Sequence, residues 1–251
     1  CHGLTVRRFR EMGMAGEIGI VLNLTPMYPE TDAEEDRLAT ARYDGYFNTW
    51  YLDPIFKGAY PRELAAWYEK KLGPLRFVLD GDMDIIREPG DFLAFNYYTR
   101  NVVKAGAGSG FPLLELDFAE TGAAKTDMDW DIHPESLYRL LTRLKEEYTA
   151  DLPLYITENG AAFDYPIEEG KVRDVSRIDY IRTHLEACLR FIREGGSLRG
   201  YFVWSFLDNF EWALGYEKRF GIVHVDYATQ KRTPKESAKW YAEVIRRNGL
   251  S

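Results

Sequence analysis

The feature that most constrains the fold is an alternation of short apolar runs with longer helical patterns. Four runs rich in β-branched and aromatic residues are predicted as buried strands: residues 18–24, 92–97, 154–157 and 200–204. The clearest helical patterns cover residues 134–148, 175–194 and 234–247, where Pro134 and Pro234 suit a first helical turn. Strands that alternate with helices pair in parallel through right-handed crossovers, so the sequence predicts an α/β fold.

The number of predicted strands is half of what a closed barrel needs. Only four long strand–helix units are visible in 251 residues, whereas a (β/α)8 barrel has eight strands. Residues 32–50 and 61–72 are also predicted as helical, and a helical stretch at 4–12 has no strand before it. We therefore expect an α/β TIM barrel of which this chain supplies roughly strands 5–8 and their helices. The chain would be one domain, residues 1–251, the C-terminal half of a barrel whose start here resembles the middle of a longer protein.

Charge and cysteine content exclude several classes of partner. The formal net charge of −8 argues against nucleic acid and anionic membranes, because an acidic surface repels both. No apolar run is long enough to span a bilayer, and the N-terminus lacks a signal-peptide pattern. Because Cys1 is terminal, we expect no structural disulfide with Cys188 and a reduced, cytoplasmic protein.

Three of the four predicted strands end in unusually polar residues. Barrel enzymes carry their catalytic groups at the carboxyl ends of their strands. The third strand ends in Thr157-Glu158-Asn159-Gly160, and a carboxylate there costs desolvation unless it has a partner. Glu158 is either a catalytic carboxylate or a structural group that caps a segment or pairs with an arginine. This position alone leaves both explanations open.

The segment after the fourth strand combines tryptophans with carboxylates. Trp204 and Trp212 enclose Asp208 and Glu211 within nine residues, in a chain whose aromatic content is 15%. Aromatic faces pack against the C–H side of a pyranose, and carboxylates accept hydrogen bonds from its hydroxyls. The pattern therefore favours a sugar pocket over its alternative, a packed aromatic corner with solvated acids.

The second strand ends with an asparagine and a tyrosine that could serve either structure or function. Asn96 and Tyr98 follow the run Phe-Leu-Ala-Phe. They either satisfy a loop backbone and fill the core, or donate hydrogen bonds to Glu158 and the substrate. Such donors would hold a nucleophile ionised and aimed.

Other patterns carry no ligand chemistry. The glycine-rich residues 106–110 favour a surface loop over a phosphate site, because they do not lead from a strand directly into a helix. His133, His184 and His224 lack ligand spacing, and no Cys/His cluster supports a metal. We therefore expect neither a metal nor a cofactor.

Three motifs together resemble glycoside hydrolase family 1, the β-glucosidases and their relatives. They match in order and spacing, and the resemblance runs from Leu22-Asn23-Leu24-Thr25-Pro26 to the final helix. The motifs are Thr157-Glu158-Asn159-Gly160, Ser205-Phe206-Leu207-Asp208-Asn209-Phe210-Glu211-Trp212 and Gly215-Tyr216-Glu217-Lys218-Arg219-Phe220-Gly221. The resemblance implies a (β/α)8 barrel and a retaining double displacement.

The resemblance also implies roles for individual residues. It puts the nucleophile at Glu158, with Asn96 and Tyr98 assisting it. It puts sugar recognition on five side chains: hydroxyl recognition at Glu211 and Trp212, a ring platform at Trp204, a pocket wall at Phe220, and the aglycone side at Trp130. Phe206 and Asn209 are expected to be structural, and Arg219 is ambiguous.

One carboxylate of the expected pair is absent from the sequence. A retaining glycosidase needs a nucleophile and an acid/base about 5–5.5 Å apart. The family carries its acid/base in an Asn-Glu-Pro motif that does not occur here, and Arg87-Glu88-Pro89 precedes a predicted strand instead of ending one. The N-terminal glycone-binding residues of the family are absent too. We therefore expect the N-terminal half of the same barrel as a partner, supplied as a fragment, a second chain or a longer protein.

The sequence thus predicts the nucleophile half of a β-glucosidase-like enzyme that hydrolyses terminal non-reducing β-glycosides. The alternative is a non-catalytic carbohydrate-binding or self-associating half-barrel scaffold. Glucoside, galactoside and fucoside preferences stay open. The intact Glu211-Trp212 pair favours an unphosphorylated sugar, because the resemblance implies that the 6-phospho branch replaces this pair.

Overall fold

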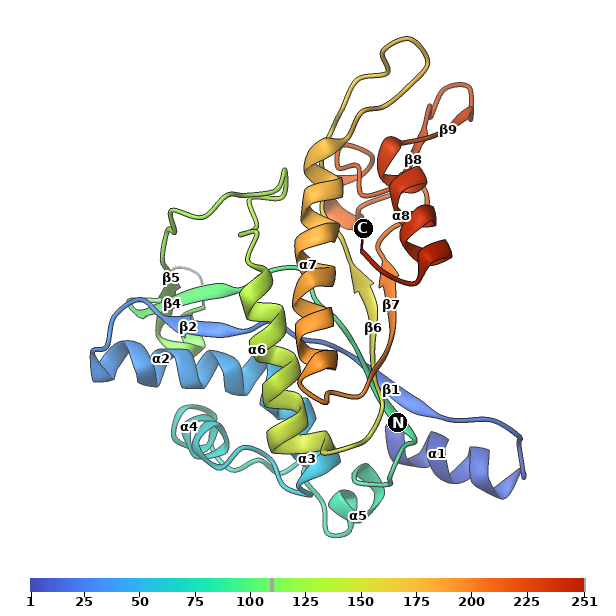
Figure 1. Ribbon diagram of the computed structural model, residues 1–251. Coiled ribbons are helices and arrows are strands. Elements are labelled where there is room, and N and C mark those ends of the chain that lie inside the picture. Colours follow the sequence, from blue (N-terminus) through green and yellow to red (C-terminus); the bar gives the residue numbers. More distant parts are fainter. Residues whose placement is uncertain (109–110, 251) are drawn as a thin grey trace.

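Four parallel strands form the central sheet of the computed structural model, which describes residues 1–108 and 111–250 (Figure 1). The strands are β1 (Gly19–Asn23), β3 (Phe92–Asn96), β6 (Leu154–Asn159) and β7 (Leu198–Val203). Their order is β1-β3-β6-β7, and every neighbouring pair is parallel. All four predicted strands are therefore present, in chain order, as expected for one half of a (β/α)8 barrel.

Eight α-helices connect and cover these strands in the described part of the chain. They are α1 (His2–Glu11), α2 (Glu34–Asp44), α3 (Trp50–Phe56), α4 (Arg62–Leu72), α5 (Asp82–Ile86), α6 (Pro134–Leu144), α7 (Val175–Arg193) and α8 (Glu236–Arg247). Single π turns, Gly45–Thr49 and Lys145–Thr149, extend α2 and α6, and short 3-10 turns lie at Pro112–Leu114 and Trp212–Leu214. No helix described here is both long and apolar enough to cross a membrane.

The start of α8 differs from the prediction. Pro134 does occupy the first turn of α6, but Pro234 ends strand β9 (Arg232–Pro234) and pairs with Val223. The helix begins two residues later, at Glu236, because a residue distant in the sequence binds its first turn. The Ser237 N–H and hydroxyl donate to Asp174 at 2.9 and 2.5 Å. A buried carboxylate therefore replaces the cap that the proline suggested.

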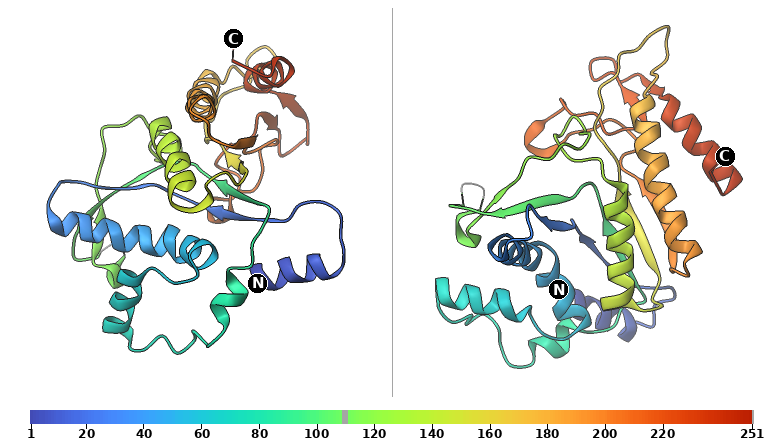
Figure 2. Two further views of the ribbon diagram at one scale, coloured as in Figure 1. Left: turned by 60° about the horizontal axis from the view of Figure 1, so that its bottom comes forward. Right: turned by 60° about the vertical axis from the view of Figure 1, so that its left-hand side comes forward.

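The helix-facing side of the sheet forms the main core. Leu93, Phe95 and Ile156 are completely buried there and pack against helices α6 and α7. Figures 1 and 2 show these two helices lying side by side along one face of the sheet. Because side chains alternate along a strand, the neighbouring positions point to the opposite face.

The opposite face of the sheet is apolar but open. Val21 on β1 is 51% exposed and Phe202 on β7 is 57% exposed. This face corresponds to the interior of the barrel, and its residues are as apolar as those of the core. The four strands therefore read as continuous apolar runs even though this chain buries only one side of them.

Two small sheets that the sequence did not predict extend the carboxyl ends of the strands. Strands β2 (Met27–Pro29), β4 (Asn101–Ala105) and β5 (Leu116–Phe118) form one, and β8 (Val223–Val225) pairs with β9 to form the other. Most of them are only three residues long, too short for a period-2 pattern to be recognised. Residues 109 and 110 of the predicted glycine-rich loop lie outside the described residues.

We predict that truncating the core is far more costly than truncating the surface. Leu93→Ala, at a fully buried position, should lower the free energy of unfolding by about 2–5 kcal/mol, because it removes buried methyl groups and leaves a cavity. Urea denaturation measures the loss. Leu72→Ala, at a site 66% exposed, is the control, and equal losses for both variants would contradict this assignment of the core.

Candidate active site

The polar strand ends lie together at the carboxyl edge of the central sheet. Glu158 is the next-to-last residue of β6, Asn96 ends β3, and Trp204 directly follows β7. Asn96 pairs with Glu158 in the β3–β6 ladder, and the Trp204 N–H donates to Asn159 O at 3.0 Å. The three polar ends singled out from the sequence are therefore neighbours in space.

The side chain of Glu158 is hydrogen-bonded to Tyr98. The Tyr98 hydroxyl donates a hydrogen bond to the Glu158 carboxylate. Burial, and then the hydrogen bond to the adjacent Glu158, raises the pKa of Tyr98 far above its usual range. The tyrosine therefore stays protonated at neutral pH and serves as a permanent donor to the Glu158 carboxylate.

Asn96 contacts the residue beside Glu158. Its amide oxygen accepts a hydrogen bond from the Thr157 hydroxyl at 2.7 Å. That bond fixes the orientation of the amide, so the NH2 group is the end that remains for another acceptor. The sequence predicted donation from Asn96 to Glu158 or to a substrate, and this stays a prediction.

Aromatic rings form a wall beside Tyr98. The Tyr98 and Trp130 rings lie 5.4 Å apart and are tilted by 56°. Phe220, only 2% exposed, lies 6.1 Å from each of them. Trp130 and Phe220, which are 90 positions apart in the sequence, are thus brought to the same side of the site.

The loop after β7 brings a second carboxylate towards Glu158. Burial, and then the negative charge of Glu158, raises the pKa of Glu211. Its backbone N–H donates to Gly215 O at 2.6 Å, which closes a tight turn. Trp212 extends outward from this turn and is 82% exposed, and its contact with a sugar stays a prediction.

Gly160 allows the β6 and β7 strand ends to approach each other. A Cβ atom on Gly160 would lie 1.7 Å from the carbonyl oxygen of Trp204. The peptide bond between Trp204 and Ser205 is cis. The Cβ atom of any larger residue at position 160 would push the Trp204 backbone away from the end of β6. This steric conflict explains why the motif has a glycine there.

A buried ionic cluster that the sequence analysis did not assign holds the loop after β7. The Asp208 side chain is fully buried and forms ion pairs with Lys235 at 2.8 Å and Arg219 at 2.9 Å. It also accepts the Gly221 N–H at 3.0 Å. Arg219, ambiguous from the sequence, is therefore a structural partner in this chain. Lys235 lies 27 positions from Asp208, a separation that carries no periodic signal.

Asn209 also supports this loop, as expected of a structural residue. Its amide nitrogen donates to the Ser205 hydroxyl and to Leu207 O, each at 3.0 Å. Phe206, the other residue expected to be structural, is 69% exposed. Among residues 1–108 and 111–250, no group of three or more His, Cys, Asp or Glu side chains is arranged to hold a metal ion.

The fold and the site together define a class of protein. Four parallel strands in chain order, with helices on one face and polar residues at their carboxyl ends, have the arrangement of one half of a (β/α)8 barrel. Residues 1–250 match the model of glycosyl hydrolase family 1. The chain belongs to this family.

Two relatives and one solved structure match this chain over almost its whole length. The 1,4-beta-D-glucan glucohydrolase of Thermotoga neapolitana is 46% identical over 100% of this chain and 55% of its own length. Beta-glucosidase A of Thermotoga maritima is 44% identical over 99% of this chain and 55% of its own length. The crystal structure of a beta-glucosidase from Exiguobacterium marinum superimposes with a TM-score of 0.93 at 48% identity, over 99% of this chain and 56% of that one. The chain thus spans about half the length of the relatives it matches.

We predict that the charge on Glu158 helps set the protonation of Glu211. Glu158→Gln removes that charge, so the pKa of Glu211 should fall towards its ordinary value, as followed by 13C NMR titration of the side-chain carboxyl. A carboxyl whose pKa is raised in the folded state stabilises the fold at low pH, and this contribution is lost as the pH rises through the raised value.

The control for this titration is Glu158→Asp, which keeps a negative charge at the same strand end. The Glu211 titration should move much less in this variant than in Glu158→Gln. An unchanged titration in Glu158→Gln would show that burial alone raises the pKa of Glu211.

Proposed function

We propose that this chain, as one domain, is the nucleophile-bearing half of a retaining β-glycosidase. The observation that carries the proposal is the hydrogen bond from Tyr98 to Glu158 at the carboxyl edge of the sheet. A hydroxyl held protonated beside a carboxylate keeps that carboxylate ionised and fixes its orientation. Family membership supports the same chemistry, because two relatives from Thermotoga species are named a 1,4-beta-D-glucan glucohydrolase and beta-glucosidase A.

The proposed reaction is a double displacement. Glu158 attacks the anomeric carbon, and the bond to the leaving-group oxygen breaks as an acid on the partner half protonates that oxygen. The resulting glycosyl ester on Glu158 is then hydrolysed by water, which the same partner residue deprotonates. Two inversions restore the original β configuration, and the sugar leaves with its anomeric hydroxyl in place of the aglycone.

The remaining site residues would hold the sugar. Glu211 accepts hydrogen bonds from glycone hydroxyls, and the raised pKa of its carboxyl falls when such donors bind. The other proposed contacts are aromatic: Trp204 under the sugar ring, Trp212 and Phe220 along the glycone, and Trp130 beside the aglycone. Asn96 completes the set by donating to the substrate or to Glu158.

The proposed substrates are terminal non-reducing β-glucosides and closely related β-glycosides. The names of the two Thermotoga relatives refer to a glucan and to β-glucosides. A relative from Bifidobacterium breve is named a bifunctional beta-D-glucosidase/beta-D-fucosidase. A solved Thermotoga maritima beta-glucosidase that is 43% identical to this chain is in complex with glucoimidazole. We infer no phosphate on the sugar, because Glu211 would repel it.

The acid/base is proposed to come from the amino-terminal half of the barrel. The chain contains no Asn-Glu-Pro motif and spans about 55% of its relatives. Glu211 is assigned to hydroxyl recognition, so a second catalytic carboxylate must approach Glu158 from outside this chain, to roughly 5–5.5 Å.

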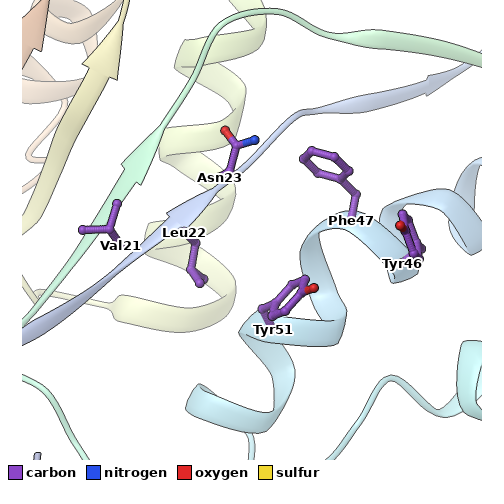
Figure 3. A pocket seen from close by; sticks show the side chains of 6 residues that line it. All are labelled: Val21, Leu22, Asn23, Tyr46, Phe47 and Tyr51. Atoms are coloured by element: carbon purple, nitrogen blue, oxygen red, sulfur yellow. The ribbon is translucent and has the colours of Figure 1, made fainter. Parts of the chain in front are cut away.

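Both edges of the sheet offer surfaces suited to that partner. At the β1 edge, a pocket of about 270 Å³ lies between Val21, Leu22 and Asn23 on the strand and the rings of Tyr46, Phe47 and Tyr51. Figure 3 shows these rings on the helical segment that faces β1. An added parallel strand would satisfy the free backbone groups of β1, and its outward side chains would fill this pocket.

The other edge of the sheet, at β7, has a pocket of its own. Tyr201 on β7 lines a cavity of about 210 Å³ together with Tyr241 and Ile245 of α8. Ile245 is 63% exposed and adds apolar surface to this cavity. An amino-terminal half that reaches both edges would cover the open sheet face and bury Val21 and Phe202.

We predict that the two halves are active only together. Mixing this chain with a purified amino-terminal half of a family relative should raise the hydrolysis of an aryl β-glucoside by at least about 100-fold, the lower range of general acid–base assistance. Glu158→Gln should abolish this gain while circular dichroism stays unchanged. Equal rates for the mixture and for either half alone would contradict the proposal.

We predict that Glu211 contributes to sugar recognition in the assembled enzyme. Glu211→Ala should lower kcat/KM for the aryl glucoside by about 10- to 100-fold, because hydrogen bonds to a charged group are worth about 1.5–3 kcal/mol. Glu217→Ala, an exposed glutamate in the same loop, is the control. Identical kinetics for the Glu211 variant and the parent would remove Glu211 from the site.

A second candidate function rests on the open apolar face. The exposure of Val21 and Phe202 favours a half-barrel that binds sugar or associates with copies of itself without catalysis. A 2-deoxy-2-fluoro β-glucoside distinguishes the two functions. Mass spectrometry should find it bound covalently to the peptide containing Glu158 in the assembled enzyme, whereas sugar binding without covalent capture would favour the scaffold.

A further inference from the structure

The strand pairing is irregular on both sides of Glu158. The β3–β6 register shifts after Phe95, so that Asn96 lies opposite Glu158 instead of Thr157. The β6–β7 register shifts again between Ile156 and Asn159. Such bulges turn a side chain in a new direction but interrupt the regular ladder. The ladder alone therefore does not fix the position of the proposed nucleophile.

The side chain of Asn159 adds to the backbone bonds at this strand end, such as that from the Tyr97 N–H to Glu158 O at 2.9 Å. It is completely buried, and its amide nitrogen donates to Tyr97 O at 2.8 Å, directly after β3, and to the Tyr180 hydroxyl at 3.1 Å on α7. Its amide oxygen accepts the Tyr201 hydroxyl of β7 at 2.5 Å. One amide thus joins three elements directly behind Glu158, and each of its polar atoms has a partner.

Tyr180 connects this amide to the donor of the Glu158 hydrogen bond. Its hydroxyl accepts from Asn159 and donates to Tyr98 O at 2.8 Å. Its ring is 1% exposed and stacks on the His184 ring with centroids 4.0 Å apart. A single hydroxyl therefore links the residue after Glu158 with Tyr98, whose own hydroxyl bonds to Glu158.

We propose that Asn159 and Tyr180 are positioning residues that set the separation of Tyr98 and Glu158. The inference rests on the proposed role of Glu158 as nucleophile. The circuit runs from Glu158 through its neighbour Asn159 to Tyr180, from there to the backbone of Tyr98, and back through the Tyr98 hydroxyl. Loss of the Tyr180 hydroxyl removes the side-chain bond that ties the Tyr98 backbone to Asn159, and small misplacements of a reacting group lower the rate steeply.

A single-turnover experiment distinguishes a residue that positions the nucleophile from one that only supports the fold. The assembled enzyme is reacted with 2,4-dinitrophenyl 2-deoxy-2-fluoro-β-glucoside, whose leaving group departs without a proton. The reaction transfers the fluorosugar to Glu158 and releases one dinitrophenolate. The amount of dinitrophenolate released counts the active sites. The first-order inactivation rate constant, ki, reports the attack by Glu158, and the dissociation constant, Ki, reports binding of the fluoroglucoside.

Tyr180→Phe keeps the ring and its stacking on His184 and removes only the hydroxyl. It should lower ki by about tenfold while Ki stays within about twofold, since an interaction that aims the nucleophile acts mainly on the chemical step. Tyr201→Phe, which frees the Asn159 oxygen, should lower ki in the same direction. An unchanged ki with fewer active sites would assign Tyr180 to folding alone and overturn the proposal.

The matched control is Tyr241→Phe, which also loses one hydroxyl bond to a main-chain carbonyl. Tyr241 donates to Tyr201 O at 3.1 Å, outside the circuit that links Tyr98 and Glu158. Its ki should equal that of the parent. A fall in ki as large as that of Tyr180→Phe would mean that any lost tyrosine hydroxyl in this region slows the reaction.

A crystal structure of the Tyr180→Phe chain decides the inference separately from the proposed function. If the parent assembly captures no fluorosugar, the proposed function fails. The structure then shows whether the Tyr98 hydroxyl has left Glu158, as positioning requires. An unchanged Tyr98–Glu158 hydrogen bond in the variant would overturn the positioning role, whatever the parent enzyme does.

Discussion

Parallel pairing of β3 with β6 is the interaction on which the rest of the site depends. Because both strands run in the same direction, the residues that follow each of them emerge at one edge. Tyr98 and Glu158, 60 positions apart, meet there in a hydrogen bond. The core of Leu93, Phe95 and Ile156 on the helix side holds this pairing. Packing on one face of the sheet thus sets the chemistry at its end.

The sheet and the proposed nucleophile could be predicted because their signals are local. The strands are continuous apolar runs, and Glu158 lies within a short motif directly after one of them. Apolar residues such as Phe202 belong to such a run although they are exposed in this chain. An apolar run therefore indicates a strand that a closed barrel could bury on both faces. It does not distinguish a face that this chain covers from one that it leaves exposed.

Long-range polar contacts could not be predicted, since no periodicity connects their members. Asp208 and Lys235 form a buried ion pair across 27 positions, and Asp174 moves the start of α8 by bonding Ser237 across 63 positions. Asn159 is recognisable as part of a motif, but its three hydrogen-bond partners are not. Such contacts follow from the tertiary fold, and they also decide how firmly the loops around Glu158 are held.

A covalent connection between the two halves would decide the kinetic order in which the free edges of the central sheet are covered. For two separate halves, closure is a bimolecular reaction whose rate depends on their concentration. Within one continuous polypeptide, a covalent connection supplies an effective concentration in the millimolar range and makes closure unimolecular. The same edges and pockets would then be covered at a rate that dilution cannot change. The strand edges of such a barrel would be exposed only briefly. This short exposure, together with a strong closed interface, would keep the barrel from pairing with other chains.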